Sequence, residues 1–253
     1  MKAIKLLFLA SALFCGSSAL LAQTKVIAHR GFWDCEGSAQ NSVTALHKAA
    51  EARVYGSEFD VLITSDGIPV VNHDDTIEGF TIEETPYASI RDIKLKNGET
   101  LPTLQTYLEE GKKYPELQLI LEIKPHKKEE NENRAVAAIV KMVKELGMEK
   151  QVEYISFSMN ICEQLLKQTP GSQVAYLKSD IVPAEIKQRG LTGIDYHFLA
   201  FEKHPEWIAD SHKEGLTVNA WTVNNEDAMK ELIEQKVDFI TTDKPLKALE
   251  LTK

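Results

Sequence analysis

Two histidines and two carboxylates of this 253-residue chain stand where they could act together on a phosphate ester. His29 follows a short apolar run and precedes Arg30, while His73 closes a second apolar run. Glu58 and Asp60 lie two residues apart within a third run. Metal-assisted attack on a phosphate ester needs carboxylates that hold a cation and imidazoles that move protons. These side chains therefore indicate a hydrolytic site.

The carboxylates favour a metal site. Glu58 and Asp60 point to the same face of a strand because side chains alternate along it. Two buried carboxylates repel each other and are costly to desolvate unless a cation holds them. Glu122, on another predicted strand, completes an all-oxygen set that suits one divalent ion, Mg²⁺ or Ca²⁺, better than zinc. The alternative is an ion-pair network in which Arg30 and Lys124 neutralise the acids.

The histidines are expected to be catalytic. His29 alone would be interpreted as a core histidine bonded to a backbone carbonyl, but together with Arg30 and His73 it matches the need for one base and one acid. The sequence does not decide which acts first, and we favour His29 as base and His73 as acid. His197 has no predicted role. The other histidines are expected to be solvated: His47, His126, His204 and His212.

Alternating apolar runs and amphipathic stretches predict the elements that position these groups. Eight strands are expected, at 25–29, 57–62, 118–123, 152–157, 173–177, 193–196, 216–221 and 237–241. Helical spacing is clear at 43–53, 104–113, 135–146 and 228–235. Repeated strand-then-helix units with nearly continuous apolar strands predict a (β/α)8 TIM barrel. An open doubly wound sheet is the alternative, but residues 30–33 are not the Gly-rich loop that it usually carries.

Active sites of such barrels lie where the strands end at their C-terminal edge. Seven candidate residues are expected at strand ends: His29, Arg30, Glu58, Asp60, Glu122, Lys124 and Trp221. His73 closes a hairpin predicted around residues 65–67, and residues 74–101 are expected to form a small insertion after the second strand. Asn41, Asn160 and Asn225 are expected to cap helices, and Gly147, Gly190 and Gly215 to end them.

The N-terminal segment has the pattern of a secretory signal peptide: Lys2 and Lys5, an apolar run, then small residues up to Ala22. Cleavage there would leave residues 23–253 as one secreted or periplasmic domain with no stable membrane insertion. The formal charge of −9, more negative still without the two lysines, argues against nucleic acid and anionic lipid as partners. Cys35 and Cys162 are expected to be free thiols rather than a disulfide.

The strings at 26–31, 58–61, 70–74, 121–125, 219–224 and 241–245 resemble the signature of the glycerophosphodiester phosphodiesterase family and stand in its order. One position departs from the pattern. Family members usually carry Pro-Glu-Asn-Thr after the first loop, where this chain reads Ala39-Gln40-Asn41-Ser42. Gln40 cannot supply the charge of that glutamate.

The resemblance implies hydrolysis of small-molecule glycerophosphodiesters to glycerol 3-phosphate and an alcohol. One histidine would deprotonate the glycerol 2-hydroxyl for attack on phosphorus while the other protonates the leaving alcohol, and water would then open the cyclic phosphate. Arg30 and Lys124 would hold the phosphate oxygens, although Lys124 could instead form an ion pair at the rim. Trp221 would either line the site beside the glycerol carbons or cap the barrel core.

Two other functions remain open. A phospholipase of type C or D acting on intact lipid would need an exposed apolar rim, for which the insertion offers Ile77, Phe80, Ile82 and Tyr87. An inactive barrel that only binds glycerophosphoesters is suggested by Gln40 alone. The leaving-group alcohol, the choice of Mg²⁺ or Ca²⁺ and the oligomeric state are not determined by the sequence.

Overall fold

The computed structural model describes residues 23–253, so the predicted signal peptide at 1–22 lies outside the described residues. Eight parallel strands form the centre of the structure. They are β1 (Lys25–Ala28), β2 (Gly56–Ile63), β6 (Gln118–Ile123), β7 (Val152–Ser156), β8 (Val174–Tyr176), β9 (Gly193–His197), β10 (Thr217–Trp221) and β11 (Phe239–Thr242). Each begins and ends within two residues of the prediction.

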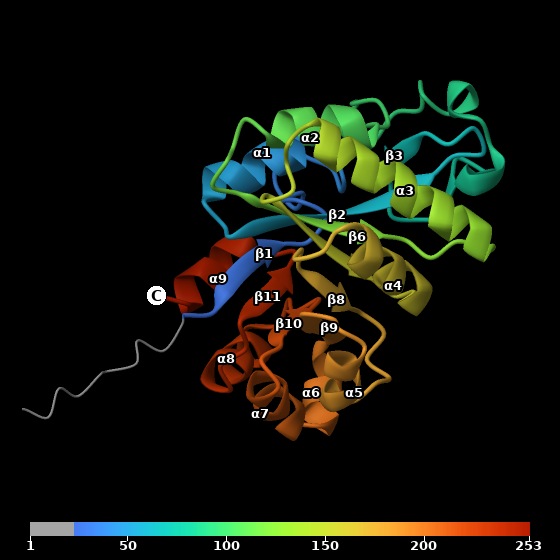
Figure 1. Cartoon of the computed structure of the whole chain (residues 1–253). Helices are drawn as coiled ribbons and strands as arrows, with labels where there is room; N and C mark the ends of the chain where they lie inside the picture. Colours follow the sequence, from blue (N-terminus) through green and yellow to red (C-terminus); the bar gives the residue numbers. More distant parts are fainter. Residues whose placement is uncertain (1–22) are drawn as a thin grey trace, which may run out of the picture.

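The sheet closes on itself because β1 pairs with both β2 and β11. All eight strands run parallel, and helices separate them along the chain, so the fold is a TIM barrel. Figure 1 shows the helices around the strands. The predicted (β/α)8 class is thus confirmed, and the open-sheet alternative is wrong.

Side-chain alternation divides each strand between two cores. On β2, Phe59 and Val61 pack outward in the main hydrophobic cluster that joins strands to helices. On β6, Ile120 belongs instead to a small inner cluster with Ile27 and Ile155. Glu122 follows Ile120 by two residues and shares its face. The strand periodicity therefore directs this carboxylate into the barrel above an apolar layer.

Nine α-helices cover the barrel within the described residues. They are α1 (Val43–Ala52), α2 (Leu104–Gly111), α3 (Glu129–Glu145), α4 (Met159–Gln168), α5 (Pro183–Gln188), α6 (Phe198–Lys203), α7 (Glu206–Lys213), α8 (Glu226–Glu234) and α9 (Pro245–Leu251). The stops at Gly147, Gly190 and Gly215 follow helix ends at positive φ, and Asn225 caps α8 as predicted.

Two helix predictions are corrected by the structure. Ser158, rather than Asn160, caps α4, and Asn160 donates from within the helix to Glu132 Oε2. α3 begins six residues before the predicted start, because its acidic first turn lacks apolar periodicity but suits the positive end of the helix dipole.

The segment between β2 and α2 is the predicted insertion. β3 (Pro69–Val71) pairs antiparallel with β2, and the short strands β4 (Thr76–Ile77) and β5 (Phe80–Thr81) pair with each other. Two 3-10 turns follow, η1 (Ile82–Glu84) and η2 (Tyr87–Ser89). The insertion lies at one side of the barrel, next to β3 and α3 (Figure 1). Its apolar residues form a small core with Leu62.

Among the described residues, no helix combines the length and apolar character needed to cross a bilayer. Cys35 and Cys162 are both free, as predicted.

Candidate active site

A cavity of about 240 Å³ opens where the barrel strands end. Seven of the eight predicted site residues line it: His29, Arg30, Glu58, His73, Glu122, Lys124 and Trp221. The eighth, Asp60, lies directly behind the lining and is 1% exposed. The structure therefore brings the predicted residues together, as expected for the C-terminal face of a TIM barrel.

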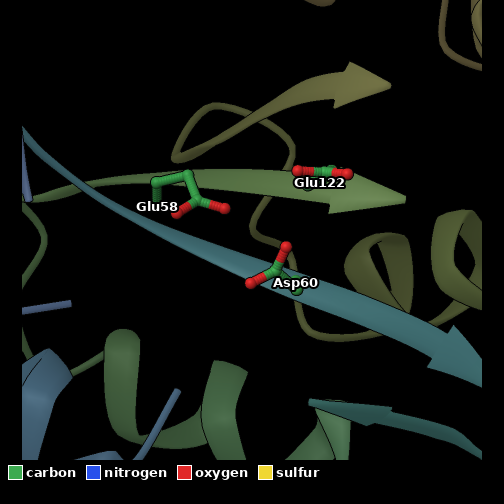
Figure 2. Close-up of side chains that lie close together, drawn as sticks. All are labelled: Glu58, Asp60 and Glu122. Atoms are coloured by element: carbon green, nitrogen blue, oxygen red, sulfur yellow. The ribbon is translucent and has the colours of Figure 1, made fainter. Parts of the chain in front are cut away.

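Three carboxylates converge within the cavity wall. Glu58 and Asp60 project from β2 and Glu122 from β6, and Asp60 is the register partner of Glu122. Figure 2 shows the three side chains directed toward a common space between the two strands. One oxygen atom from each lies within 4.8 Å of the others, so the three could hold a single ion.

Two cations partly neutralise this cluster. Lys124 Nζ lies 3.2 Å from Asp60 Oδ1 and 2.9 Å from Glu122 Oε1. Arg30 Nε lies 3.8 Å from Asp60 Oδ2. Among the described residues, no other lysine or arginine is within ion-pair distance of the three acids, so one negative charge is left in excess when all are ionised.

The pKa values of the acids follow from this shortage of positive charge. Burial, with the charges of Asp60 and Glu122, raises the pKa of Glu58 well above its ordinary value. Burial and Asp60 likewise raise the pKa of Glu122. Burial would raise the pKa of Asp60 too, but Lys124 and the other positive or hydrogen-bonding neighbours lower it. Two of the three carboxylates are therefore poorly stabilised as anions.

These residues fit a hard divalent cation. Glu122 Oε1 is buried and, although close to Lys124, has no donor aligned for a hydrogen bond. An ion at the cluster would supply the missing positive charge and accept this free lone pair, and carboxylate oxygens are ligands preferred by Mg²⁺ and Ca²⁺. Glu58, Asp60 and Glu122 are the residues that would hold it.

His29 is held by a carboxylate that sequence reasoning did not assign. Its Nδ1 lies 2.8 Å from Asp243 Oδ1, just beyond β11. Asp243 also accepts hydrogen bonds from Trp33 Nε1 at 2.9 Å and Asn224 Nδ2 at 2.7 Å. Burial opposes ionisation, yet these donors, His29 foremost, lower the pKa of Asp243 to about 2. An ionised Asp243 can only accept, so His29 carries a proton on Nδ1, and in the neutral tautomer its Nε2 is the nitrogen that can accept a proton.

His73 lines the cavity from the segment that follows β3. Its Nδ1 lies 2.6 Å from Asp74 Oδ1. Burial lowers the pKa of His73, against the raising effect of Asp60. The two histidines thus differ in their partners: His29 is bound to a half-buried carboxylate with three donors, and His73 to an exposed one.

The segment that carries Arg30 has an unusual backbone. Arg30 adopts φ 54°, in the left-handed region that costs free energy for a residue with a Cβ. Its N–H donates to Glu58 Oε2 at 2.7 Å, and its carbonyl accepts from the Asn41 N–H at 3.0 Å. These bonds keep Arg30 at the cavity despite the strain. Its Nη1 also donates to Gln40 Oε1 at 2.8 Å, so Gln40 still binds the guanidinium without carrying charge.

Asn41 does not cap α1 as predicted; Ser42 does. Asn41 is buried at φ 60°, its Nδ2 donates to Asp60 Oδ2 at 2.9 Å, and its Oδ1 accepts from the Asp60 N–H at 3.1 Å. Asparagine tolerates the left-handed region better than most residues. Asn41 therefore positions Asp60.

Part of the cavity lining is aromatic. Trp221 and Phe157 meet edge to face at 5.4 Å between ring centroids, and Trp221 Nε1 donates to the carbonyl of Asp195 at 2.8 Å. Trp221 thus lines the cavity and also braces the barrel. The Asp195 side chain lies deeper, and burial raises its pKa to about 8. Sequence reasoning did not assign Asp195, because its apolar strand is typical of barrel core.

A sequence model of the glycerophosphoryl diester phosphodiesterase family matches residues 29–247. A crystal structure of a glycerophosphodiester phosphodiesterase from Parabacteroides distasonis is 44% identical, with a TM-score of 0.90, covering 91% of this chain and 97% of that one. A phosphodiesterase from Oleispira antarctica, solved with the product sn-glycerol-3-phosphate, is 26% identical, with a TM-score of 0.76 and coverages of 90% and 96%.

A glycerophosphodiester phosphodiesterase from Caldanaerobacter subterraneus subsp. tengcongensis is 29% identical over 243 residues, which is 88% of this chain and 95% of that protein.

Proposed function

The chain belongs to the glycerophosphodiester phosphodiesterase family, and from this we propose that it hydrolyses glycerophosphodiesters to glycerol 3-phosphate and an alcohol with one bound divalent ion. The observation that carries the proposal is the single cavity that holds two histidines, an arginine, a lysine and the carboxylate cluster. The structure from Oleispira antarctica supports the choice of product, because that protein was solved with sn-glycerol-3-phosphate.

Positive charge at the phosphate is the first requirement of the reaction. When bound to Glu58, Asp60 and Glu122, a divalent ion would polarise the phosphate and stabilise the charge that develops on its oxygens. Arg30 and Lys124 line the same cavity and would add donors to the phosphate. Together with the ion they would exceed the charge of the three acids by one, which matches a singly charged phosphodiester.

Proton transfer is the second requirement. His29 Nε2, left free by the bond to Asp243, would take the proton of the glycerol 2-hydroxyl as its oxygen attacks phosphorus. His73 would give a proton to the leaving alcohol oxygen as its bond to phosphorus breaks. Water would then open the cyclic phosphate, with the two histidines exchanging roles.

The proposal is tested by hydrolysis of sn-glycero-3-phosphocholine, with glycerol 3-phosphate as the measured product. His29→Ala and His73→Ala should each lower kcat by about 10³-fold or more, because a missing proton-transfer group typically costs about 10²–10⁴ and both steps need both groups. Thermal unfolding should stay close to that of the parent. His212→Ala, at an exposed histidine paired with Asp238, is the matched control and should keep full activity.

Full activity in either cavity variant would reject these roles. Binding of the substrate without release of product would instead indicate an inactive binding barrel, the function suggested by Gln40. That function is not favoured, because Gln40 keeps its hydrogen bond to Arg30.

Action on intact phospholipid is not favoured either. Of the four apolar side chains of the insertion that could form a membrane-facing rim, Ile82 is buried, Ile77 and Tyr87 pack against the small core of the insertion, and Phe80 is exposed. A liposome-binding assay tests for action on intact lipid, because a phospholipase would bind the vesicles and an enzyme for small glycerophosphodiesters would not.

We also propose that the protein is exported, on the signal-peptide pattern of residues 1–22. Fractionation of cells that express the full chain should recover activity in the periplasm or medium, with an N-terminus near residue 23. Replacement of Lys2 and Lys5 by glutamate should hold the activity in the cytoplasm, whereas an unprocessed parent chain in the cytoplasm would reject export.

A further inference from the structure

A second hollow, a groove of about 610 Å³, lies between the β1–α1 segment and the insertion. Its walls come from residues 33–40, 72–78 and 93–96. Pockets that bury a small-molecule ligand usually measure about 300–1,000 Å³. The catalytic cavity, at about 240 Å³, is below this range and the groove is within it. The larger space is thus outside the residues assigned to the reaction.

The groove adjoins the catalytic cavity at three points. Gln40 lines the groove and accepts the hydrogen bond of Arg30, which lines the cavity. Trp33 lines the groove and donates to Asp243, the partner of His29. Asn72 lines the groove and directly precedes His73 in the chain. An occupant of the groove would therefore continue from a phosphate held beside Arg30 and His73.

The lining indicates what kind of group would bind. Trp33, Ile77, Ile93 and Leu95 are half-buried and form an apolar floor. The exposed rim carries both signs of charge, with Glu36 and Glu78 against Lys94 and Lys96, while Asp34 is paired with Lys244. Because the rim has no dominant sign and the floor is apolar, charge does not select the ligand. Burial of an apolar group against this floor would instead favour binding.

We propose that this groove binds the leaving alcohol of the substrate and favours alcohols that carry a bulky apolar part. The inference rests on the proposed function, because His73 must protonate the alcohol oxygen, and His73 adjoins the groove. The glycerol and phosphate would occupy the cavity, and the alcohol substituent would extend over Trp33, Ile93 and Leu95.

The test is a series of sn-glycero-3-phosphate esters of methanol, butanol and hexanol, used as monomers in solution. Full burial of a methylene changes affinity about fourfold, so the half-open groove should raise kcat/KM about twofold per methylene. If kcat/KM stays constant or falls from the methyl to the hexyl ester while the methyl ester is still hydrolysed, the proposed alcohol-binding role of the groove is wrong. The proposed function would then still stand. Failure to hydrolyse the methyl ester and glycerophosphocholine alike would reject the proposed function itself.

A matched pair of variants tests whether the preference for longer alcohols depends on the groove. Leu95→Ser should reduce the preference for the hexyl over the methyl ester by about fivefold or more. Leu246→Ser, at a side chain that is 57% exposed and lines neither hollow, should leave this preference as in the parent. An unchanged preference in a folded Leu95→Ser protein would overturn the proposal, and the parent series remains decisive if that variant fails to fold.

Discussion

Asp243 determines how one of the two proposed catalytic histidines presents itself to a substrate. It binds His29 through Nδ1 and is itself held by Trp33 and Asn224. Because outer hydrogen-bond partners of this type fix ring orientation and tautomer, Asp243 acts as a positioning residue. It touches no part of the space where the phosphate would lie.

Asp243→Asn should lower kcat for glycerophosphocholine by about 10²-fold with little change in KM, because an amide can donate to Nδ1 and favour the wrong tautomer. Steady-state kinetics check this, with Asp210→Asn as the control, because Asp210 is exposed on α7 and lines neither the cavity nor the groove. A rise in KM with unchanged kcat would contradict the positioning role.

The same variant should show a pH-dependent loss of stability. The pKa of Asp243 is lowered from 3.8 to about 2 in the folded state, so its stabilising effect is complete above pH 4 and is lost as the pH falls toward 2. Urea unfolding should therefore find Asp243→Asn about 1–2 kcal/mol less stable at pH 7, after allowance for partial exposure. The gap should close near pH 2, and a gap of constant size would mean that the charge is not responsible.

At this scale the sequence predicted which side chains gather but not how they are held. The strand-end rule predicted seven of the eight proposed site residues, and all seven lie at the cavity or, for Asp60, behind its lining. Glu58 and Asp60 nevertheless lie within β2 rather than at its end, so for these two the expected position was wrong. The bond between His29 and Asp243 joins residues 214 apart, which a single sequence cannot reveal. Asp243 nevertheless follows β11 directly, so the strand-end rule could have nominated it. The predicted cap at Asn41 is wrong because Asn and Ser both cap helices and the two stand side by side.

At the scale of elements, the turn from β1 into α1 depends on one glycine. Gly31 has φ 75°, and a Cβ placed there would lie 2.6 Å from Ala45 Cβ and 2.8 Å from the Ala45 carbonyl carbon. The same turn carries Arg30 in its left-handed conformation. The close packing of α1 on this turn therefore fixes the side of the cavity that carries Arg30.

Gly31→Ala should destabilise the protein by about 3 kcal/mol or more, since a backbone penalty of about 1–2 kcal/mol is joined by overpacking of about 1–3 kcal/mol. Gly37→Ala is the matched control, because Gly37 has the same φ of 75° and a Cβ added to it would meet nothing within 4 Å. Gly37→Ala should lower the free energy of unfolding by the backbone penalty alone, about 1–2 kcal/mol. Equal losses of unfolding free energy in the two variants would show that the contact with Ala45 can relax.

The elements themselves were largely predictable, for a physical reason. Buried parallel strands are continuous apolar runs bounded by polar turns, so their ends are visible in the sequence. The acidic first turn of α3 was missed because its charged side chains follow no apolar period. Helix starts next to two capping residues were also ambiguous, as Ser158 and Asn160 show.

At the scale of the whole molecule, a divalent ion bound at the carboxylate cluster would link folding stability to the concentration of that ion. The folded barrel forces three acids together against two cations, an arrangement that the unfolded chain does not have to maintain. Any ion that binds the folded state alone stabilises it by mass action.

Millimolar Mg²⁺ or Ca²⁺ should therefore raise the Tm of EDTA-treated protein by about 5–10 °C, which corresponds to about 2.7 kcal/mol at a hundredfold excess over Kd in a chain of this size. Differential scanning calorimetry checks the shift. Glu122→Gln, which removes one ligand charge, should abolish most of it. The same Tm with and without either ion in the parent protein would contradict an ion site at the cluster.

The ring of strands is joined between its first and last members, where β1 pairs with β11 and the His29 N–H donates to the Thr242 carbonyl at 3.0 Å. The residue that orients His29 is the next one along, Asp243. A chain that ended before β11 would lack the strand that closes the ring beside β1, the cavity residue Thr241 and the carboxylate that holds His29. If His29 is the base, as proposed, hydrolysis would begin only after the final strand has joined the barrel, and product formation would report the completion of folding.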